Sequence, residues 1–298
     1  MKFVGENILE FTDRFPNDHS CLAYLSEQKW ADGFKCKKCG HSKFTIRKKN
    51  LAMDCNRCHH VESPTAGTLF HRVRFGVRKA FGIVFEMSAT TKGLSSSQVA
   101  KRYGISRTTA WTFMHKVRNA MKSSKNHPLI GDVQVDEFVF GGKESQKQGR
   151  STDSKKKKIV GAVELTDEGK VKRVYFNKIG DYSSKSLSSI FDNHISAEAH
   201  VLTDKWTGYV PISKRFNIEQ KYSDKGGSMK QMHTIIHQLK SWLRSTYSWI
   251  HEDHIEKYLD EFSYRINRSI YKQTIFHNLI LRMLDAQPIT YQMIKIST

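Results

Sequence analysis

The sequence has 298 residues, with 49 lysines and arginines against 29 aspartates and glutamates, so its formal net charge is +20. This length exceeds one ordinary domain, and the charge indicates a polyanionic partner, most simply nucleic acid. The lack of an 18-residue apolar run excludes a transmembrane helix, and the first 30 residues are not typical of a signal peptide. We therefore expect a cytoplasmic protein without a membrane partner.

The N-terminal segment, residues 1–32, is predicted to contain one or two short amphipathic helices. Apolar residues between Phe11 and Leu25 are spaced roughly as one helical face, and Asn17 offers an N-cap. Cys21 stands apart from the other cysteines, which is typical of a small residue buried in a core.

Four of the five cysteines form two Cys-x-x-Cys pairs with 15 residues between the pairs: Cys36 with Cys39, and Cys55 with Cys58. Two such turns bind one tetrahedral Zn²⁺. A disulfide framework is the alternative, but it is typical of small exported domains, and this chain is large without an export signal. The pattern predicts a zinc site formed by the four thiolates.

Residues 33–64 are accordingly predicted to form a zinc ribbon, with strands at 43–48 and 52–54. A module of this size buries little core, so the metal must hold it together. Four thiolates complete the zinc shell, so the nearby His41, His59 and His60 are not expected to bind the ion. The ribbon is strongly basic, which favours contact with phosphates.

Residues 65–122 are predicted to be helical and to bind DNA. One helix is expected over 75–90, a second begins after a Ser95 cap, and Gly104-Ile105-Ser106 forms a turn before a helix over 107–118. This is the pattern of a helix-turn-helix, with a plain helical hairpin as the alternative. The residues predicted to contact DNA are Arg107, Thr108 and Thr109.

After a predicted linker at 122–131, residues 131–270 indicate a mixed sheet flanked by helices. The alternation of apolar residues predicts strands and a helix. The expected strands are 133–140, 158–165, 170–178, 199–203 and 218–222, with a helix over 182–193 and another between the last two strands. Residues 143–158 form a basic segment, read either as a mobile loop that closes on DNA or as a solvated hairpin tip.

Two aspartates carry the predicted chemistry of this domain. Asp136 lies within the first strand and Asp204 ends the fourth, so the two would be neighbours if those strands form a parallel pair. Paired carboxylates with open positions suit Mg²⁺ or Mn²⁺ and a two-metal reaction on a phosphodiester. Glu137 is expected on the opposite face of the strand from Asp136 and not to be a ligand.

These residues resemble the insertion-sequence transposases of the ISXO-like group. The resemblance rests on Val135-Asp136-Glu137-Phe138-Val139-Phe140-Gly141-Gly142-Lys143 and on Thr203-Asp204 followed by Trp206 and Tyr209. It extends from the cysteine ribbon to Tyr258-Leu259-Asp260-Glu261-Phe262-Ser263-Tyr264-Arg265-Ile266-Asn267-Arg268, about residues 10–270. The resemblance implies a ribonuclease H-like fold and DNA strand transfer with Mg²⁺ or Mn²⁺.

The third acidic position of that family departs from glutamate in this sequence. Alignment of the catalytic helix places His237 at the acid position and Arg244 at the basic position seven residues later, with Lys240 on the same helix face. His237 would bind metal, orient the nucleophile or contact DNA, and would favour Mn²⁺ somewhat. Lys240 and Arg244 would bind phosphates. The rivals for the third position are His233, Glu252 and Glu256.

Further along, Trp242 and Trp249 are interpreted as core residues of the same helical stretch. Residues 258–268 are predicted to be a closing helix on the sheet, and 271–298 a helical extension. The sequence as a whole predicts an α+β multidomain transposase that binds terminal inverted repeats and acts on DNA as a dimer or larger assembly. The alternatives are a DNA-binding regulator with an inactive catalytic domain, and a ribonuclease H-like nuclease without joining activity.

Overall fold

The computed structural model describes residues 2–90, 92–141, 156–222, 224 and 227–296. The chain forms two compact units. One contains the residues up to Met121 together with the segment from Ile270 onward, and the other contains Lys122–Ser269. The described residues include no helix long and apolar enough to cross a membrane.

The first unit is helical apart from the cysteine-containing ribbon. Its helices are α1 (Ile8–Arg14), α2 (Asp18–Lys29), α3 (Val77–Ala89), α4 (Ser96–Tyr103), α5 (Arg107–Met121), α9 (Lys272–Asp285) and α10 (Tyr291–Ile296). The predicted caps are present: Asn17 begins α2, Ser95 and Gln98 form a capping box on α4, and Gly104 ends α4 with φ +59°.

The C-terminal segment completes the core of this first unit. Helix α9 contacts α2, α3 and α5, and the ring of Phe276 packs among phenylalanines from the N-terminal segment and α3. These are Phe3, Phe11, Phe15, Phe81 and Phe85, with ring centroids 5.4 to 5.8 Å from that of Phe276. Such aromatic packing buries large apolar areas, so the helices of the extension are part of a core.

The ribbon is a three-stranded antiparallel sheet in the order β1-β2-β3. Its strands are β1 (Phe44–Ile46), β2 (Met53–Cys55) and β3 (Val61–Glu62). The first two were predicted. The third follows the second cysteine turn and is only two residues long, too short for a periodic signal.

The second unit contains a five-stranded mixed sheet in the order β6-β5-β4-β7-β8. The strands are β4 (Asp132–Phe140), β5 (Lys157–Leu165), β6 (Val171–Ile179), β7 (His200–Asp204) and β8 (Asn217–Lys221). Strand β4 pairs antiparallel with β5 and parallel with β7, and β7 pairs parallel with β8. All five predicted strands are confirmed.

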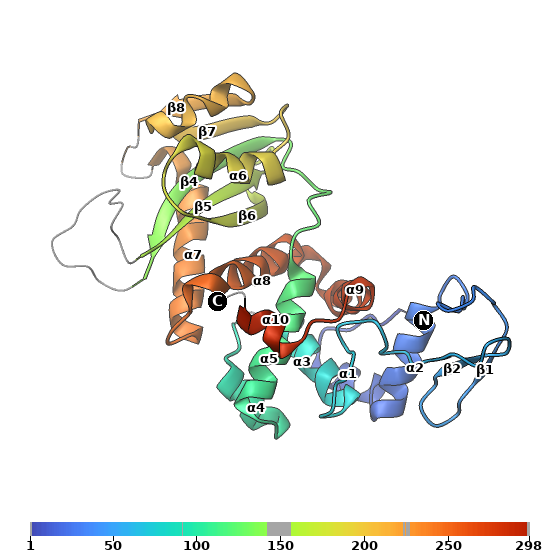
Figure 1. Cartoon of the computed structure of the whole chain (residues 1–298). Coiled ribbons are helices and arrows are strands. Elements are labelled where there is room, and N and C mark those ends of the chain that lie inside the picture. The colour runs from blue at the N-terminus through green and yellow to red at the C-terminus, as the bar shows by residue number, and fades with distance from the viewer. Residues whose placement is uncertain (1, 91, 142–155, 223, 225–226, 297–298) are drawn as a thin grey trace. The chain divides into compact units, whose positions relative to one another are not determined.

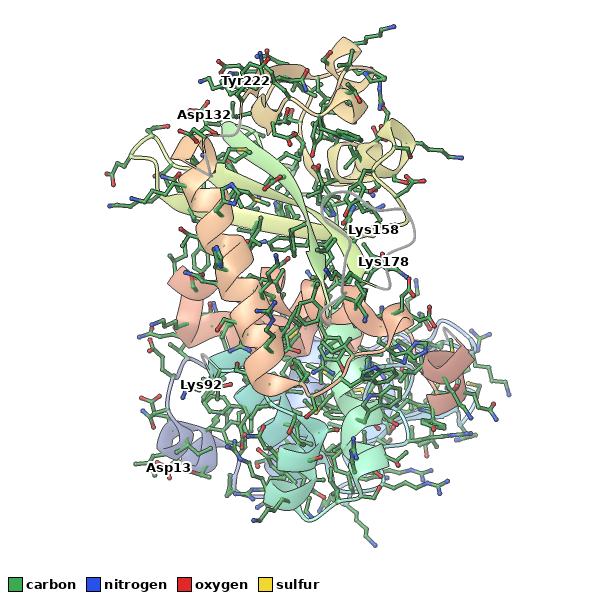
Figure 2. All side chains as sticks on the ribbon, turned by 90° about the vertical axis from the view of Figure 1, so that its left-hand side faces the viewer. Asp13, Lys92, Asp132, Lys158, Lys178 and Tyr222 are labelled. Carbon is green, nitrogen blue, oxygen red and sulfur yellow. The ribbon has the colours of Figure 1, made fainter. Side chains whose placement is uncertain are left out.

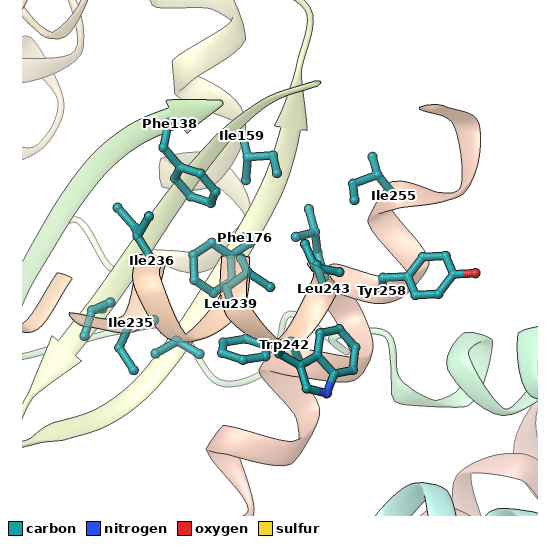
Figure 3. Packing of buried hydrophobic residues seen from close by; sticks show 14 of the residues in the cluster. Phe138, Ile159, Phe176, Ile235, Ile236, Leu239, Trp242, Leu243, Ile255 and Tyr258 are labelled. Atoms are coloured by element: carbon teal, nitrogen blue, oxygen red, sulfur yellow. The ribbon is translucent and has the colours of Figure 1, made fainter. Parts of the chain in front are cut away.

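Helices cover both faces of this sheet (Figure 1). Helix α6 (Ser184–His194) packs on one face with Val133 and Val135 of β4. Helices α7 (Lys230–Thr246) and α8 (Ile255–Asn267) pack on the other with Phe138, and Figure 3 shows Ile236, Leu239 and Leu243 of α7 in this second core. The alternation of β4 between the two cores follows from the period of two of a strand.

The chain between β7 and β8 forms two 3-10 turns, η1 (Thr207–Tyr209) and η2 (Ile212–Lys214), where a helix was predicted. Three other such turns are η3 (Gly227–Met229), η4 (Glu252–His254) and η5 (Ser269–Tyr271). Figure 2 shows the side chains of the sheet, with Asp132 at the start of β4 and Lys158 of β5 toward its other end.

Two expectations about packing need correction. Trp249 is not a core residue, because α7 ends at Thr246 and the indole beyond it is 74% exposed, although Trp242 is buried. The predicted linker is partly structured: Leu129 is fully buried and forms a bridge with Ile195. Of the basic segment 143–158, residues 143–155 lie outside the described part of the chain.

Candidate functional site

The four ribbon cysteines converge on one point. The Sγ atoms of Cys36 and Cys58 are 3.6 Å apart, as are those of Cys39 and Cys55, and all four sulfurs lie within 4.8 Å of one another. A tetrahedral ion with Zn–S bonds of about 2.3 Å requires sulfurs about 3.8 Å apart. The donor set therefore fits the predicted structural Zn²⁺.

The backbone of each cysteine turn explains this convergence. In the first turn the N–H of Gly40 donates to the carbonyl of Cys36, and in the second the N–H of His59 donates to that of Cys55. Gly40 and His59 both have positive φ, +75° and +52°. The turn reverses the chain so tightly that both sulfurs of each pair face the same side.

A buried ion pair joins the ribbon to the helix before it. Glu62 of β3 is 2% exposed, and its Oε1 lies 2.7 Å from Nζ of Lys29 on α2 and 3.0 Å from Nζ of Lys37. Burial lowers the pKa of Lys29, whereas the Glu62 carboxylate raises it. The Lys29 ammonium also donates to the carbonyls of Ser63 and Ala66, so its desolvated charge is well supported.

In the second unit, Asp136 and Asp204 come together as the sequence predicted. Strand β4 pairs with β7 in a constant parallel register, from Asp132 with His200 to Gln134 with Leu202. Continuing that register places Asp136 opposite Asp204. Their carboxylates lie within 4.8 Å of each other and of a third carboxylate, that of Glu137. Hard oxygen ligands at this spacing fit Mg²⁺ or Mn²⁺.

Glu137 was expected on the opposite face of β4 from Asp136, and its contact with Tyr209 of the α6-side core agrees with that face. Its carboxylate nevertheless lies close to those of the two aspartates, and the expectation that it is not a ligand stays a prediction. Its carboxylate accepts a 2.6 Å hydrogen bond from the hydroxyl of Tyr209, a fully buried residue in η1. Burial, and then the negative charge of Glu137, raise the pKa of Tyr209 well above its ordinary value, so this hydroxyl stays a donor. Strand alternation gives no sign of this contact, because it depends on the chain after β7.

Helix α7 carries two histidines that were candidates for this site, His233 and His237. Nε2 of His233 lies 3.9 Å from Oδ2 of Asp136. Burial first, then the charges of His237 and Lys240, hold the pKa of His233 below its usual value, which favours the neutral ring. His237 is exposed, and the described carboxylate group contains no histidine. The assignment of His237 to the site therefore stays a prediction.

The other rivals for the third position lie elsewhere in the same unit. Glu252 is in η4, and its carboxylate is 2.9 Å from Nζ of Lys178. Glu256 is exposed in the first turn of α8. Neither belongs to the group around Asp136.

The exposed face of α7 carries a basic pocket of about 590 Å³. It is lined by His237, Lys240, Ser241, Arg244 and Ser245. Burial, followed by the charge of Arg244, lowers the pKa of Lys240, and Asp136 opposes that change. The ammonium of Lys240 also lies 5.1 Å from the ring centre of Phe138 on β4. The predicted phosphate-binding pair thus shares one surface with His237.

A second basic pocket, of about 440 Å³, lies in the first unit along α5. It is lined by residues of α5, Thr108, Thr109, Thr112, Phe113 and Lys116, and by Arg72, Val73, Arg74, Phe75 and Tyr291. None of these described lining residues is acidic. Arg107 is exposed at the first position of α5. Of the three residues of α5 predicted to contact DNA, two therefore line this pocket, and sequence reasoning missed its cations, Arg72, Arg74 and Lys116.

Two family models match the chain, one in each unit. The ISXO2-like transposase domain matches residues 128–267, which include the three carboxylates and α7. The transposase zinc-ribbon domain matches residues 16–61, which include the four cysteines. No curated protein is significantly similar to the chain. Together the two matches cover more than half of the sequence, and the chain belongs to the ISXO2-like transposases.

Proposed function

We propose that this protein cleaves DNA at the ends of an insertion sequence and joins those ends to target DNA. The observation that carries the proposal is the meeting of Asp136 and Asp204 on adjacent parallel strands of a transposase domain. The sheet order, with three antiparallel strands followed by two parallel ones, supports a ribonuclease H-like fold. Strand transfer needs such a paired carboxylate site.

The residues divide the reaction between them. Asp136 and Asp204 would hold Mg²⁺ or Mn²⁺, which when bound supplies an activated nucleophile and stabilises the leaving oxygen. Lys240 and Arg244 bind DNA phosphates from the basic face of α7, and His237 orients DNA or the nucleophile beside them. Cleavage frees a 3′-hydroxyl, and in-line attack by that hydroxyl on target DNA makes the new bond. Neither step needs a covalent protein intermediate.

The first unit recognises the terminal inverted repeats. Helices α4 and α5, joined across Gly104, act as a helix-turn-helix, and Arg107, Thr108 and Thr109 contact the DNA. The zinc ribbon adds a basic surface that contacts phosphates. Two element ends must be held together for joining, so the active form on DNA is a dimer or a larger assembly.

The test is a strand-transfer assay with the element's own ends, in Mg²⁺ and in Mn²⁺. Asp136→Asn should abolish cleavage and joining while end binding stays near normal, because an amide keeps the shape of the side chain but loses its negative charge. His237→Ala should reduce joining. Full joining by Asp136→Asn would contradict the two-metal assignment, and full activity of His237→Ala in both metals would remove His237 from the site.

A catalytically inactive DNA-binding regulator is the second candidate. It is favoured by α7, which brings His233 to within 3.9 Å of Asp136 and carries a histidine, His237, at the position where the family usually has an acid. The same assay separates the two candidates. A wild-type protein that binds the ends but makes no cleaved or joined product with either metal would be the regulator.

A further inference from the structure

We infer that Glu137 supplies the third carboxylate of the catalytic metal site and that the hydroxyl of Tyr209 holds it there. This inference rests on the proposed strand-transfer function. It places the third acid on β4, beside the first, so that the histidines of α7 need not replace a missing glutamate as metal ligands.

The edge of β4 makes this arrangement possible. Its pairing with β7 stops at Gln134 and Leu202, whereas its pairing with β5 continues to Phe140. Beyond Gln134 the described register of β4 with β7 does not continue. Asp136 and Glu137 start from opposite faces of β4, but where β7 no longer pairs with β4 the long side chain of Glu137 can bring its carboxylate within 4.8 Å of that of Asp136. The usual reason to exclude Glu137 does not apply there.

Backbone hydrogen bonds orient the two aspartates near that edge. The backbone N–H of Glu137 donates to Oδ1 of Asp136 at 2.9 Å, so the aspartate is oriented by a backbone group of its own strand. The backbone N–H of Trp206 donates to Oδ1 of Asp204 at 3.1 Å. Each aspartate is thus oriented by a backbone N–H that closely follows it in the chain, and the three carboxylates meet within 4.8 Å.

Tyr209 fixes the longer side chain of Glu137. The tyrosine is fully buried on the α6 side of the sheet, and its hydroxyl donates to Oε2 at 2.6 Å, the length of a charge-assisted bond. A carboxylate has two oxygens and about four lone pairs, so one donor orients it without using its capacity to bind an ion. Partners of this kind are known to tune metal ligands.

Charge supplies the remaining step. Three carboxylates this close repel one another if all are ionised, and a divalent cation among them would offset that repulsion. Helix α7 adds His233 and Lys240 near Asp136, and neither is an acid. Within the described residues, the carboxylate that completes the set is that of Glu137.

The experiment measures Mn²⁺ affinity of the zinc-loaded full chain by electron paramagnetic resonance of free Mn²⁺. Glu137→Gln keeps an oxygen to accept from Tyr209 but loses the charge, and its affinity should fall about tenfold or more. Tyr209→Phe removes the hydroxyl and should weaken binding several-fold. Glu219→Gln is the matched control, because Glu219 lies on β8 beside Lys221, outside the carboxylate group, and should bind as wild type.

Unchanged Mn²⁺ affinity in Glu137→Gln would overturn the inference, since a purely structural glutamate tolerates this replacement. Thermal unfolding of each variant verifies that it is folded. If Glu137→Gln does not fold, Tyr209→Phe decides: unchanged affinity overturns the inference, and weakened affinity supports it.

Strand transfer, measured separately, distinguishes this inference from the proposed function. Suppose that Asp136→Asn loses strand transfer while Glu137→Gln keeps both strand transfer and Mn²⁺ affinity. The proposed function would then be supported, and Glu137 would not be a metal ligand. The opposite outcome is also possible. If the wild-type protein transfers no strand but Glu137→Gln still binds Mn²⁺ more weakly than wild type, the metal site is supported and the proposed strand-transfer function is rejected.

Discussion

Gly161 shows how closely the sheet and α7 approach at the candidate site. It pairs with Asp136 across β4 and β5. A Cβ atom at this position would lie 2.5 Å from the Phe176 ring and 2.7 Å from Cε of Met232 on α7. Gly161→Ala should therefore displace packed side chains and lower the free energy of unfolding by about 1–3 kcal/mol. Urea denaturation measures the change.

Gly180→Ala is the control for that substitution. Gly180 lies in the same unit, just beyond β6, and no atom would lie within 4 Å of an added Cβ. The free energy of unfolding of Gly180→Ala should stay within about 0.5 kcal/mol of that of wild type. If Gly161→Ala were as stable as Gly180→Ala, the packing of α7 over Asp136 would be looser than the structure indicates.

At the residue scale, the meeting of the Asp136 and Asp204 carboxylates could be predicted from the sequence, whereas the proximity of the Glu137 carboxylate could not. The aspartates follow from apolar alternation and from the rule that parallel neighbours bring equivalent positions together. The position of Glu137 depends on where β4 and β7 stop pairing and on Tyr209, 72 residues away. Periodicity predicts the face on which a side chain starts, but not how far a long side chain such as that of Glu137 reaches toward its neighbours.

At the scale of elements, the C-terminal end of α6 contains a pH-sensitive histidine. The ring of His194 stacks on that of Tyr175 at 4.3 Å, and burial, with a smaller effect of Lys125, lowers the pKa of His194 to about 4. An unfolded histidine titrates near 6.5. The unfolded chain thus binds more protons between these values, so stability is full above pH 6.5 and is lost as pH falls toward 4.

The predicted loss for wild type between pH 7 and pH 5 is about 2 kcal/mol from this residue alone. His194→Gln should lack that part of the pH dependence. Urea unfolding of both proteins at the two pH values gives the difference between them, in which contributions from other groups cancel. Identical slopes with pH would show that His194 is protonated as readily in the folded chain as in the unfolded one.

Helix α5 carries a prediction about DNA. Lys116 lines the same pocket as Arg72 and Arg74, and burial lowers the pKa of its ammonium. A phosphate in this pocket would pair with it, so Lys116→Gln should weaken end binding and reduce the salt slope of log affinity by about 1. Lys272→Gln, at the exposed start of α9, should change neither. Equal salt slopes in the two variants would argue against phosphate at this pocket.

Most elements could be predicted because their signals are local. The cap of α4 at Ser95, the turn at Gly104 and the five strands of the sheet depend on residues within a few positions. The failures have non-local causes. Trp249 is exposed because α7 ends three residues earlier, and β3 has only two residues, so it is recognised by its pairing with β2 rather than by its own sequence.

At the scale of the whole molecule, the chain returns to its first unit after finishing its second. The transposase-domain match ends at residue 267, and α9 then supplies core to the helices before Met121. Backbone bonds reinforce the aromatic packing: the N–H of Gly5 donates to the carbonyl of Gln273, and that of Leu69 to the carbonyl of Met283. The sequence analysis treated residues 271–298 as a separate extension. Helical periodicity shows that one face of a helix is buried, but it does not show which part of the chain covers that face.

Phe276→Ala tests this discontinuous unit. Phe276 is 1% exposed among five other phenylalanine rings, and truncating such a residue costs about 3–5 kcal/mol. The loss should appear as earlier thermal unfolding and weaker end binding, with Mn²⁺ affinity retained because the carboxylates belong to the other unit. Leu281→Ala, on the same helix but 38% exposed, should cost far less. A Phe276→Ala protein as stable as Leu281→Ala would mean that the first unit folds without α9.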